Sequence, residues 1–435
     1  MDTALAEVSD GATKPAPPPA LRWAVLGLAS LVMFGNYYVY DCIGPVAGLL
    51  QSQLHFTDAQ IGLLNAVYSI PNVFVVLVGG VLADRLGTRI AVLLFTAICF
   101  LGALLTALSG SLFTMALGRL LFGLGAESLI VAVTASLGQW FKGKQLGFAF
   151  GINLSLSRAG SFVADWSPTW ARRFYDAGWQ PALMVSVVFA LASLAAAVLY
   201  FLMERTAEPR YELVRPKPSD RFVWSDLWRF NGSYWLVVGL CVTFYSVVLP
   251  FRSTFAIKFF QDTRGLPLDE AGQMNSWVFL AAIFATPLFG LLVDRLGRRS
   301  LFMTFGTFVL APAFLLLAYT RWDLWISNAM IGVAFSLVPA VLWPSVPYLV
   351  EERRLGTAFG LMTLLQNIGL AFFNWFAGQL DDWGGASANN PAGYQPMLWM
   401  FALLSLAGLV FSALLRRRET TGVAHGLETI RARGM

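Results

Sequence analysis

Charged residues are scarce in this chain of 435 residues, where Asp, Glu, Lys and Arg together make up only 13%. Soluble globular proteins carry about 25% of such residues, so the composition excludes a soluble enzyme and a disordered protein. Cysteine and histidine are also rare, with three and two copies. The odd number of cysteines argues against a disulfide framework, and His55 and His425 lie too far apart to suggest a metal site. The sequence contains no nucleophile–base arrangement and no phosphate-binding loop, so we expect neither an enzyme nor a cofactor.

Apolar runs fill most of the chain. Hydrophobic residues make up 57%, and the mean hydropathy is +0.64. The runs are continuous rather than alternating, which excludes a β-barrel, and a helix needs roughly 20 apolar residues to cross a bilayer. We therefore predict an all-α membrane protein with twelve transmembrane helices, at 22–50, 58–82, 89–109, 111–140, 143–167, 178–203, 232–260, 268–293, 299–319, 323–350, 355–382 and 395–416.

One long polar gap divides these spans into two sets of six. The expected organisation is a disordered tail over 1–21, a six-helix bundle over 22–203, a linker over 204–231, a second bundle over 232–416 and a tail over 417–435. The tails, the linker and the loops on their side hold 22 of the 30 Lys and Arg residues, against five on the opposite side. The positive-inside rule then places both termini and the linker in the cytoplasm. The basic residues form no contiguous arm, so no nucleic-acid partner is expected.

The two halves share two sequence motifs. The segment Gly79-Gly-Val-Leu-Ala-Asp-Arg-Leu-Gly-Thr-Arg89 returns 210 residues later as Gly290-Leu-Leu-Val-Asp-Arg-Leu-Gly-Arg-Arg299. Likewise, Leu146-Gly-Phe-Ala-Phe-Gly151 returns 209 residues later as Leu355-Gly-Thr-Ala-Phe-Gly360. The repeats predict two pseudo-symmetric six-helix bundles, an arrangement of secondary transporters in which the substrate site lies between the halves near the midplane.

The doubled loop motif, together with Gly118-Arg119-x-x-x-Gly123-x-Gly125, resembles the major facilitator superfamily over the whole length of the chain. The resemblance implies that Asp84 and Asp294 latch the cytoplasmic ends of the halves together when the protein opens outward. An Asp at such a loop can face the positive N-terminal end of a neighbouring helix. The expected latch residues are Gly80, Asp84, Arg85, Gly87, Arg89, Asp294, Arg295, Gly297 and Arg299.

Two charged residues are expected near the middle of the membrane. Glu127 and Arg158 each lie about 22 Å from the entry side of their helices, at about 1.5 Å per residue. A charge at this depth costs about 2.5–3.5 kcal/mol on insertion scales and marks a functional candidate. One interpretation is a buried ion pair that only holds two helices together, and the other is that both line the substrate cavity. The second half has Ser336 and Asn367 at the matching positions, and this asymmetry favours a polar substrate held mainly by the first half.

The residue types indicate a zwitterionic substrate. Arg158 can bind a carboxylate in bidentate geometry, and Glu127 and Asp41 suit an ammonium group. An amino acid, a betaine or a short peptide would fit this pattern. Three neighbouring tyrosines, Tyr37, Tyr38 and Tyr40, could add hydroxyl groups or a ring facing the cation. We expect two of the three to serve packing instead.

Several stretches resemble the branch of the superfamily that contains the lysosomal dipeptide uniporters. They are Phe34–Asp41, Gly118–Leu129, Trp140–Lys144, Ser155–Ser161, Leu342–Pro344, Leu355–Gly360 and Gln366–Gly369. The resemblance implies a facilitator of short peptides in which Glu127 and Arg158 bind the peptide termini, with Asp41 at a further family position. Second-half candidates are Gln366, Asn367 and Trp343, the last in a Leu-Trp-Pro break where a helix would kink.

The remaining buried charges leave an alternative open. Arg119, Arg158 and Arg252 could serve a proton-coupled exporter of organic anions or drugs, and an extra cavity arginine at Arg252 would favour anionic substrates. Glu127 and Asp41 would be the proton carriers in a coupled mechanism.

Asp165 and Lys258 lie close enough to the ends of their spans to be interfacial. Asp165 and Arg252 also depart from the pattern of the branch.

These observations predict a transporter of di- or tripeptides that works by alternating access, as a uniporter or linked to protons. The alternatives are the exporter and a membrane receptor or scaffold without transport, which the intact doubled loop motif disfavours. We expect contacts with the lipid bilayer and a small substrate, a monomer, and a bacterial-type protein of the cytoplasmic membrane. The sequence does not indicate an accessory subunit.

Overall fold

The computed structural model describes residues 15–141, 145–211, 213, 229–320, 322–421 and 424–429, without the side chains of 73–85. Most of the expected linker and parts of both tails therefore lie outside the described residues. The same holds for the latch side chains Asp84 and Arg85 and for Gly80.

Helices account for nearly all of the described chain. The first half contains α1 (Pro19–Asp41), α2 (Ile43–Leu54), α3 (Asp58–Leu86), α4 (Thr88–Leu108), α5 (Leu112–Phe141), α6 (Leu146–Asp165), α7 (Ser167–Trp170), α8 (Arg172–Asp176) and α9 (Trp179–Ala207). The second half contains α10 (Gly232–Pro250), η2 (Phe251–Phe255), α11 (Ala256–Arg264), α12 (Leu268–Leu296), α13 (Arg299–Tyr319), α14 (Leu324–Leu349), η3 (Glu352–Arg354), α15 (Leu355–Gly384), η4 (Pro391–Tyr394) and α16 (Gln395–Thr420).

The predicted twelve-helix architecture is confirmed. Among the described residues, ten segments are long and apolar enough to cross a membrane, counting α1 with α2 and α10 with η2 and α11 as single spans. Helices α3 and α6, of 29 and 20 residues, complete the twelve. They pack between the halves, α3 against α15 and α6 against α12.

Both halves interrupt their first spanning helix at the same repeat position. The first interruption is at Cys42, between α1 and α2, and the second is the π-helical turn that starts at Phe251, 209 residues later. Pro45 lacks the N–H that would bond to the carbonyl of Asp41, and Pro250 lacks the corresponding donor to Ser246. The predicted spans 22–50 and 232–260 missed both interruptions. At Trp343 the helix is not interrupted: α14 continues through Pro344 to Leu349, and the kink expected there stays a prediction.

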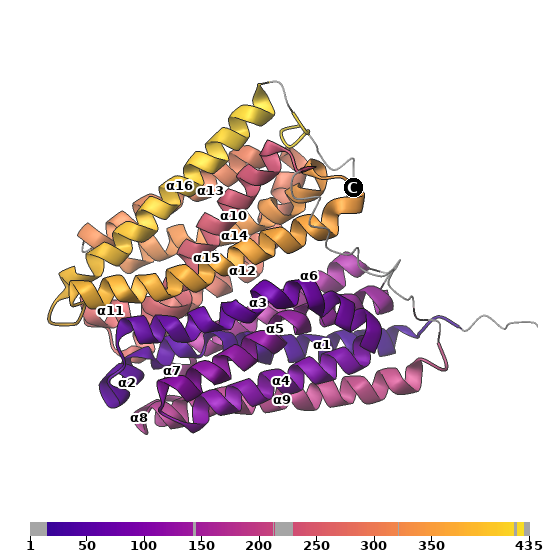
Figure 1. Cartoon of the computed structure of the whole chain (residues 1–435), viewed down its shortest axis with the longest axis horizontal. Coiled ribbons are helices and arrows are strands. Elements are labelled where there is room, and N and C mark those ends of the chain that lie inside the picture. The colour runs from indigo at the N-terminus through magenta and orange to yellow at the C-terminus, as the bar shows by residue number, and fades with distance from the viewer. Residues whose placement is uncertain are drawn as a thin grey trace, which may run out of the picture.

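The two halves form a wedge. Figure 1 shows the first half, coloured indigo to magenta, meeting the second half at the end where α2 and α11 lie, and diverging towards the end where the chain terminates. We call these ends the far side and the terminus side. Among the described residues, the hydrogen bonds and ion pairs that connect the halves lie between the middle of the bundle and the far side, from Asn72–Asn367 to Asp58–Lys258. The structure is thus closed on the far side and open on the terminus side.

Backbone contact seals the far side where α3 crosses α15. A Cβ built on Gly62 would lie 2.2 Å from the carbonyl oxygen of Asn374, and one built on Gly378 would lie 2.1 Å from that of Asp58. These contacts are closer than any side-chain carbon tolerates, so the crossing requires glycine at both positions.

Replacing Gly62 by alanine should therefore hold the far side apart and shift the population to the far-side-open state. The check is the distance between spin labels on cysteines introduced at Ala177 and Ala388, two exposed far-side positions in different halves. The three buried native cysteines are replaced by alanine in this background. Gly27→Ala is the matched control, because nothing lies within 4 Å of its added Cβ. An unchanged distance distribution in Gly62→Ala would show that this contact does not limit closure.

Candidate functional site

A cavity of about 560 Å³ lies between the halves, on the inner side of the far-side closure. Helices α1, α3, α5 and α6 line it from the first half, and η2 and helices α10, α12, α14 and α15 line it from the second. The structure brings all eight predicted substrate-binding residues to this cavity: Tyr37, Tyr40, Asp41, Glu127, Arg158, Trp343, Gln366 and Asn367. Their roles in binding stay predictions.

Arg158 and Glu127 do not bind each other in the described structure. The guanidinium of Arg158 donates to the carbonyl oxygen of Ala282 at 2.8 Å and to the hydroxyl of Thr286 at 2.5 Å, both on α12. Its Cζ also lies 5.5 Å from the ring centroid of Phe335. These partners are neutral, so the cation has no counter-ion among its described contacts.

Glu127 faces the same cavity from α5. Its carboxylate accepts weak hydrogen bonds from the hydroxyl of Tyr68 at 3.3 Å and from the amide of Asn72 at 3.5 Å. Both donors are neutral, so the anion also lacks a counter-ion among its described contacts. The alternative of a structural Glu127–Arg158 ion pair is not what this conformation contains.

The second-half wall is built from amides and aromatic rings. The indole N–H of Trp343 donates to the hydroxyl of Tyr245 at 2.8 Å, and its ring stacks on Phe359. Asn367 accepts a hydrogen bond of 3.1 Å from Asn72 across the two halves. Gln366 accepts a hydrogen bond from the thiol of Cys241 at 3.4 Å.

Of the three neighbouring tyrosines, Tyr37 and Tyr40 line the cavity, while Tyr38 stacks on Phe189 at 4.1 Å between centroids.

Sequence reasoning missed several polar residues at the cavity and between the halves. Tyr68 of α3 and Thr286 of α12 line the cavity. Asn65 and Asn72 recur with Tyr68 every three to four residues, so they form one polar stripe on α3, and both hydrogen-bond to the second half. Asn275 of α12 hydrogen-bonds to Asp165 of the first half. Helical periodicity of polar residues was the signal that could have found them.

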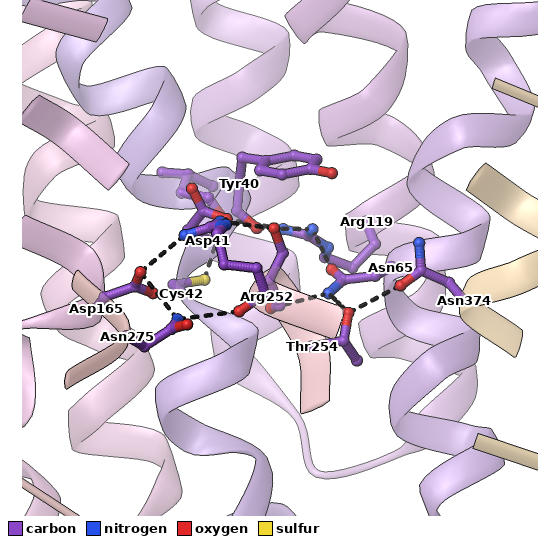
Figure 2. A network of polar contacts seen from close by, with 12 residues as sticks. Tyr40, Asp41, Cys42, Asn65, Arg119, Asp165, Arg252, Thr254, Asn275 and Asn374 are labelled. Carbon is purple, nitrogen blue, oxygen red and sulfur yellow. Dashed lines mark hydrogen bonds and ion pairs between the residues drawn. The ribbon is translucent and has the colours of Figure 1, made fainter. Parts of the chain in front are cut away.

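The floor of the cavity is a buried charge cluster that we call the far-side triad: Asp41, Asp165 and Arg252. Figure 2 shows the guanidinium of Arg252 between the two carboxylates. It donates to Asp165 at 2.7 Å and forms an ion pair with Asp41, and all three side chains are 1% exposed. Asn275 donates to Asp165 at 3.0 Å. Since Asp41 and Asp165 belong to the first half and Arg252 to the second, the triad holds the halves together.

The triad bears on three expectations. Arg252 is not a free cavity cation, because two carboxylates already face it. Asp41 has Arg252 as a counter-ion and still lines the cavity, so its role towards an ammonium group stays a prediction. Asp165 and Lys258, expected near the ends of their spans, are 1% and 4% exposed and form ion pairs between the halves.

Arg119 hydrogen-bonds to the backbone of α1 and to a side chain of α3. Its guanidinium donates to the carbonyl oxygens of Val39 at 2.9 Å and Tyr40 at 3.1 Å and to the amide oxygen of Asn65 at 2.6 Å. These carbonyls lie at the end of α1 where the helix is interrupted, so Arg119 satisfies them. From Asn65, hydrogen bonds continue to Thr254 at 2.7 Å and from Thr254 to Asn374 at 2.8 Å (Figure 2).

On the terminus side, three of the latch residues form ion pairs within their own halves. Arg299 pairs with Asp294 at 2.6 Å, and Arg89 pairs with Glu208 at 2.6 Å. This arrangement agrees with an open terminus side.

The model of the Major Facilitator Superfamily matches residues 29–274 and 251–431. The chain belongs to this superfamily. As a member of the Major Facilitator Superfamily it is a multi-pass membrane transporter and not an enzyme.

Two sets of relatives add detail. The chain is 32% identical to the lysosomal dipeptide transporter MFSD1 of Bos taurus, over 84% of this chain and 81% of the relative. The match to MFSD1 of Homo sapiens is 32% over 83% and 80%. The probable sulfoacetate transporter SauU of Cupriavidus necator is 25% identical over 78% and 83%.

A solved structure of a bacterial homologue of the lysosomal transporter Spinster, described as inward-facing and unoccupied, superimposes with a TM-score of 0.74. It is 17% identical and covers 92% of this chain and 98% of its own. At this identity the likeness shows the fold of the superfamily alone.

Proposed function

We propose that the protein carries di- or tripeptides with free termini across the membrane by alternating access. The observation that supports this is the pair of opposite charges in one cavity, each without a counter-ion among its described contacts. Arg158 would bind the C-terminal carboxylate and Glu127 the N-terminal ammonium, while the amide and aromatic wall of the second half would face the peptide backbone and side chains. The likeness to the dipeptide transporter MFSD1 points to the same substrate class.

The volume of the cavity agrees with a small peptide. Ligand sites of about 300–1,000 Å³ are typical for small molecules, and this cavity measures about 560 Å³. Tyr37, Glu127 and Arg158 line the same cavity, so both charges act on one volume. The exporter of organic anions is less well supported, because Arg252 faces two carboxylates and Arg119 binds carbonyl oxygens.

We also propose that the terminus side faces the cytoplasm, in a bacterial-type cytoplasmic membrane, because it holds most of the Lys and Arg residues. The structure would then be inward-open. In the outward-open state Asp294 and Arg299 would exchange their present pairing for contacts between the halves.

Free dipeptides should raise the melting temperature of the purified protein, since a ligand that binds only the folded state stabilises it by mass action. At a dipeptide concentration of about 100 times the dissociation constant, the free energy of unfolding should rise by about 2.7 kcal/mol. The measurement is a thermal-shift series with a dipeptide, its N-acetyl form, its C-terminal amide and the corresponding single amino acids. The N-acetyl form and the C-terminal amide should not raise the melting temperature. Equal stabilisation by blocked peptides or by organic anions would contradict the proposal and favour the exporter.

A further inference from the structure

Asp381, near the far-side end of α15, is a buried carboxylate without a partner. Its side chain is 0% exposed, and no hydrogen-bond donor in the described structure reaches either carboxylate oxygen. An ionised carboxylate in such a place loses its hydration without compensation, which is among the most expensive arrangements in a protein. Its side chain therefore needs a ligand that removes the charge.

The charged groups around Asp381 come from every element packed there. They are Asp58 of α3, Lys258 and Asp262 of α11 and Asp382 of α15, with the hydroxyl of Tyr394 from η4. The ammonium of Lys258 lies 2.9 Å from Asp58, 2.9 Å from the hydroxyl of Tyr394 and 3.6 Å from Asp262. Among the described contacts of this ammonium group are two of the four carboxylates, Asp58 and Asp262, but not Asp381.

Asp382 and Asp262 are already satisfied. The carboxylate of Asp382 accepts the backbone N–H groups of Asp58 at 2.8 Å and Ala59 at 3.0 Å, so it caps α3 from the other half. Asp262 accepts the hydroxyl of Tyr394 at 2.5 Å. The unpaired oxygens of the cluster are both those of Asp381 and one of Asp58. These two carboxylates share the excess negative charge.

The cluster spans the joint between the halves, outside the transport cavity. Asp58 belongs to the first half, while Asp381, Lys258 and Asp382 belong to the second. Asp381 lies one helical turn beyond Gly378, where α15 contacts the backbone of Asp58. None of the charged residues of this cluster lines the cavity. Since α3 packs on α15, opening of the far side would move Asp58 away from Asp381 and would admit water to it.

We propose that Asp381 is a proton-binding site that couples closure of the far side to proton uptake. In the closed state one carboxylate oxygen of Asp381 takes a proton from hydronium and releases water, and the neutral acid tolerates burial. When the far side opens, hydrated Asp381 ionises and returns the proton to the water on that side. The ligand is a proton rather than a metal ion, since the described residues contain no group of three or more His, Cys, Asp or Glu that could hold a metal. The site goes beyond the proposed peptide binding and does not depend on it.

The test is the distance between spin labels at Ala177 and Ala388 as a function of pH, in detergent or lipid nanodiscs and without substrate. In the otherwise native protein, low pH should favour the short, closed distance and high pH the long one. Asp381→Asn mimics the protonated acid, so it should stay closed over the whole pH range. Asp58→Asn removes a neighbouring negative charge and should move the midpoint to lower pH by about one unit or more.

Asp176→Asn is the matched control, because Asp176 is an exposed far-side carboxylate whose side chain is 69% exposed. It should leave the pH profile unchanged. A profile that survives in Asp381→Asn overturns the proposal. So does closure driven by sodium at constant pH and lost in Asp381→Asn, because the site would then bind a metal cation. Dipeptide binding, measured separately by thermal shift, distinguishes failure of this proposal from failure of the proposed function.

Discussion

Replacing Arg158 by glutamine should reduce uptake of a free dipeptide into proteoliposomes by about 100-fold. The guanidinium would contribute two charge-assisted hydrogen bonds to the peptide carboxylate, and hydrogen bonds to charged groups are worth about 1.5–3 kcal/mol. Folding should be retained, because the present partners of Arg158 are a carbonyl and a hydroxyl and no buried carboxylate is left unpaired.

The substrate series makes this prediction specific to one end of the peptide. Arg158→Gln should abolish the preference for a free C-terminus over an amide, while keeping the preference for a free N-terminus over an N-acetyl group. Glu127→Gln should show the reverse pattern. Arg173→Gln, at an exposed arginine of α8, serves as the control and should transport normally. If Arg158→Gln loses uptake of both forms without changing their ratio, Arg158 acts on conformation rather than on the carboxylate.

Replacing Arg252 by methionine should destabilise the protein by about 3–5 kcal/mol, because it leaves two buried carboxylates without their cation. The measurement is the thermal or denaturant unfolding of the purified variant. The triple variant Asp41→Asn, Asp165→Asn, Arg252→Met removes all three charges, and its stability should recover most of the loss. It should also populate the far-side-open state more than the native protein, because the triad connects the halves.

Stability and label distance of the triple variant together show whether the triad controls closure of the far side or only stabilises the fold. Recovery of stability together with more far-side opening would identify the triad as a closing device. Recovery of stability with an unchanged label distance would show that the triad only completes the packing. If Arg252→Met is as stable as the native protein, water must already reach Asp41 and Asp165. That result would contradict the burial of these two side chains.

Much of the fold and of the site followed from the sequence. Bilayer thickness fixes the length of an apolar span, so the twelve helices could be counted. The internal repeat gave the two halves. Charge inside the membrane is expensive, so Glu127 and Arg158 had to face a cavity or each other, and the structure places both on the cavity.

Local signals also failed in identifiable ways. The interruptions at Cys42 and Phe251 arise because Pro45 and Pro250 lack one donor each, an effect that hydropathy does not record. The polar stripe of Asn65 and Asn72 was visible in the periodicity of α3. A few neutral polar residues change the mean hydropathy of a long apolar span only slightly, so the stripe was overlooked.

The sequence alone determined the class, the number of spans, the repeat and the identity of the buried charges, because each depends on composition and local spacing. Only the tertiary structure decided which charges meet. Arg252 pairs with residues 211 and 87 positions away, Lys258 takes Asp58 as its partner, and Asp381 is left without one. Helical periodicity sets which residues share a face, but contacts between faces of different halves depend on how the two bundles are tilted against each other.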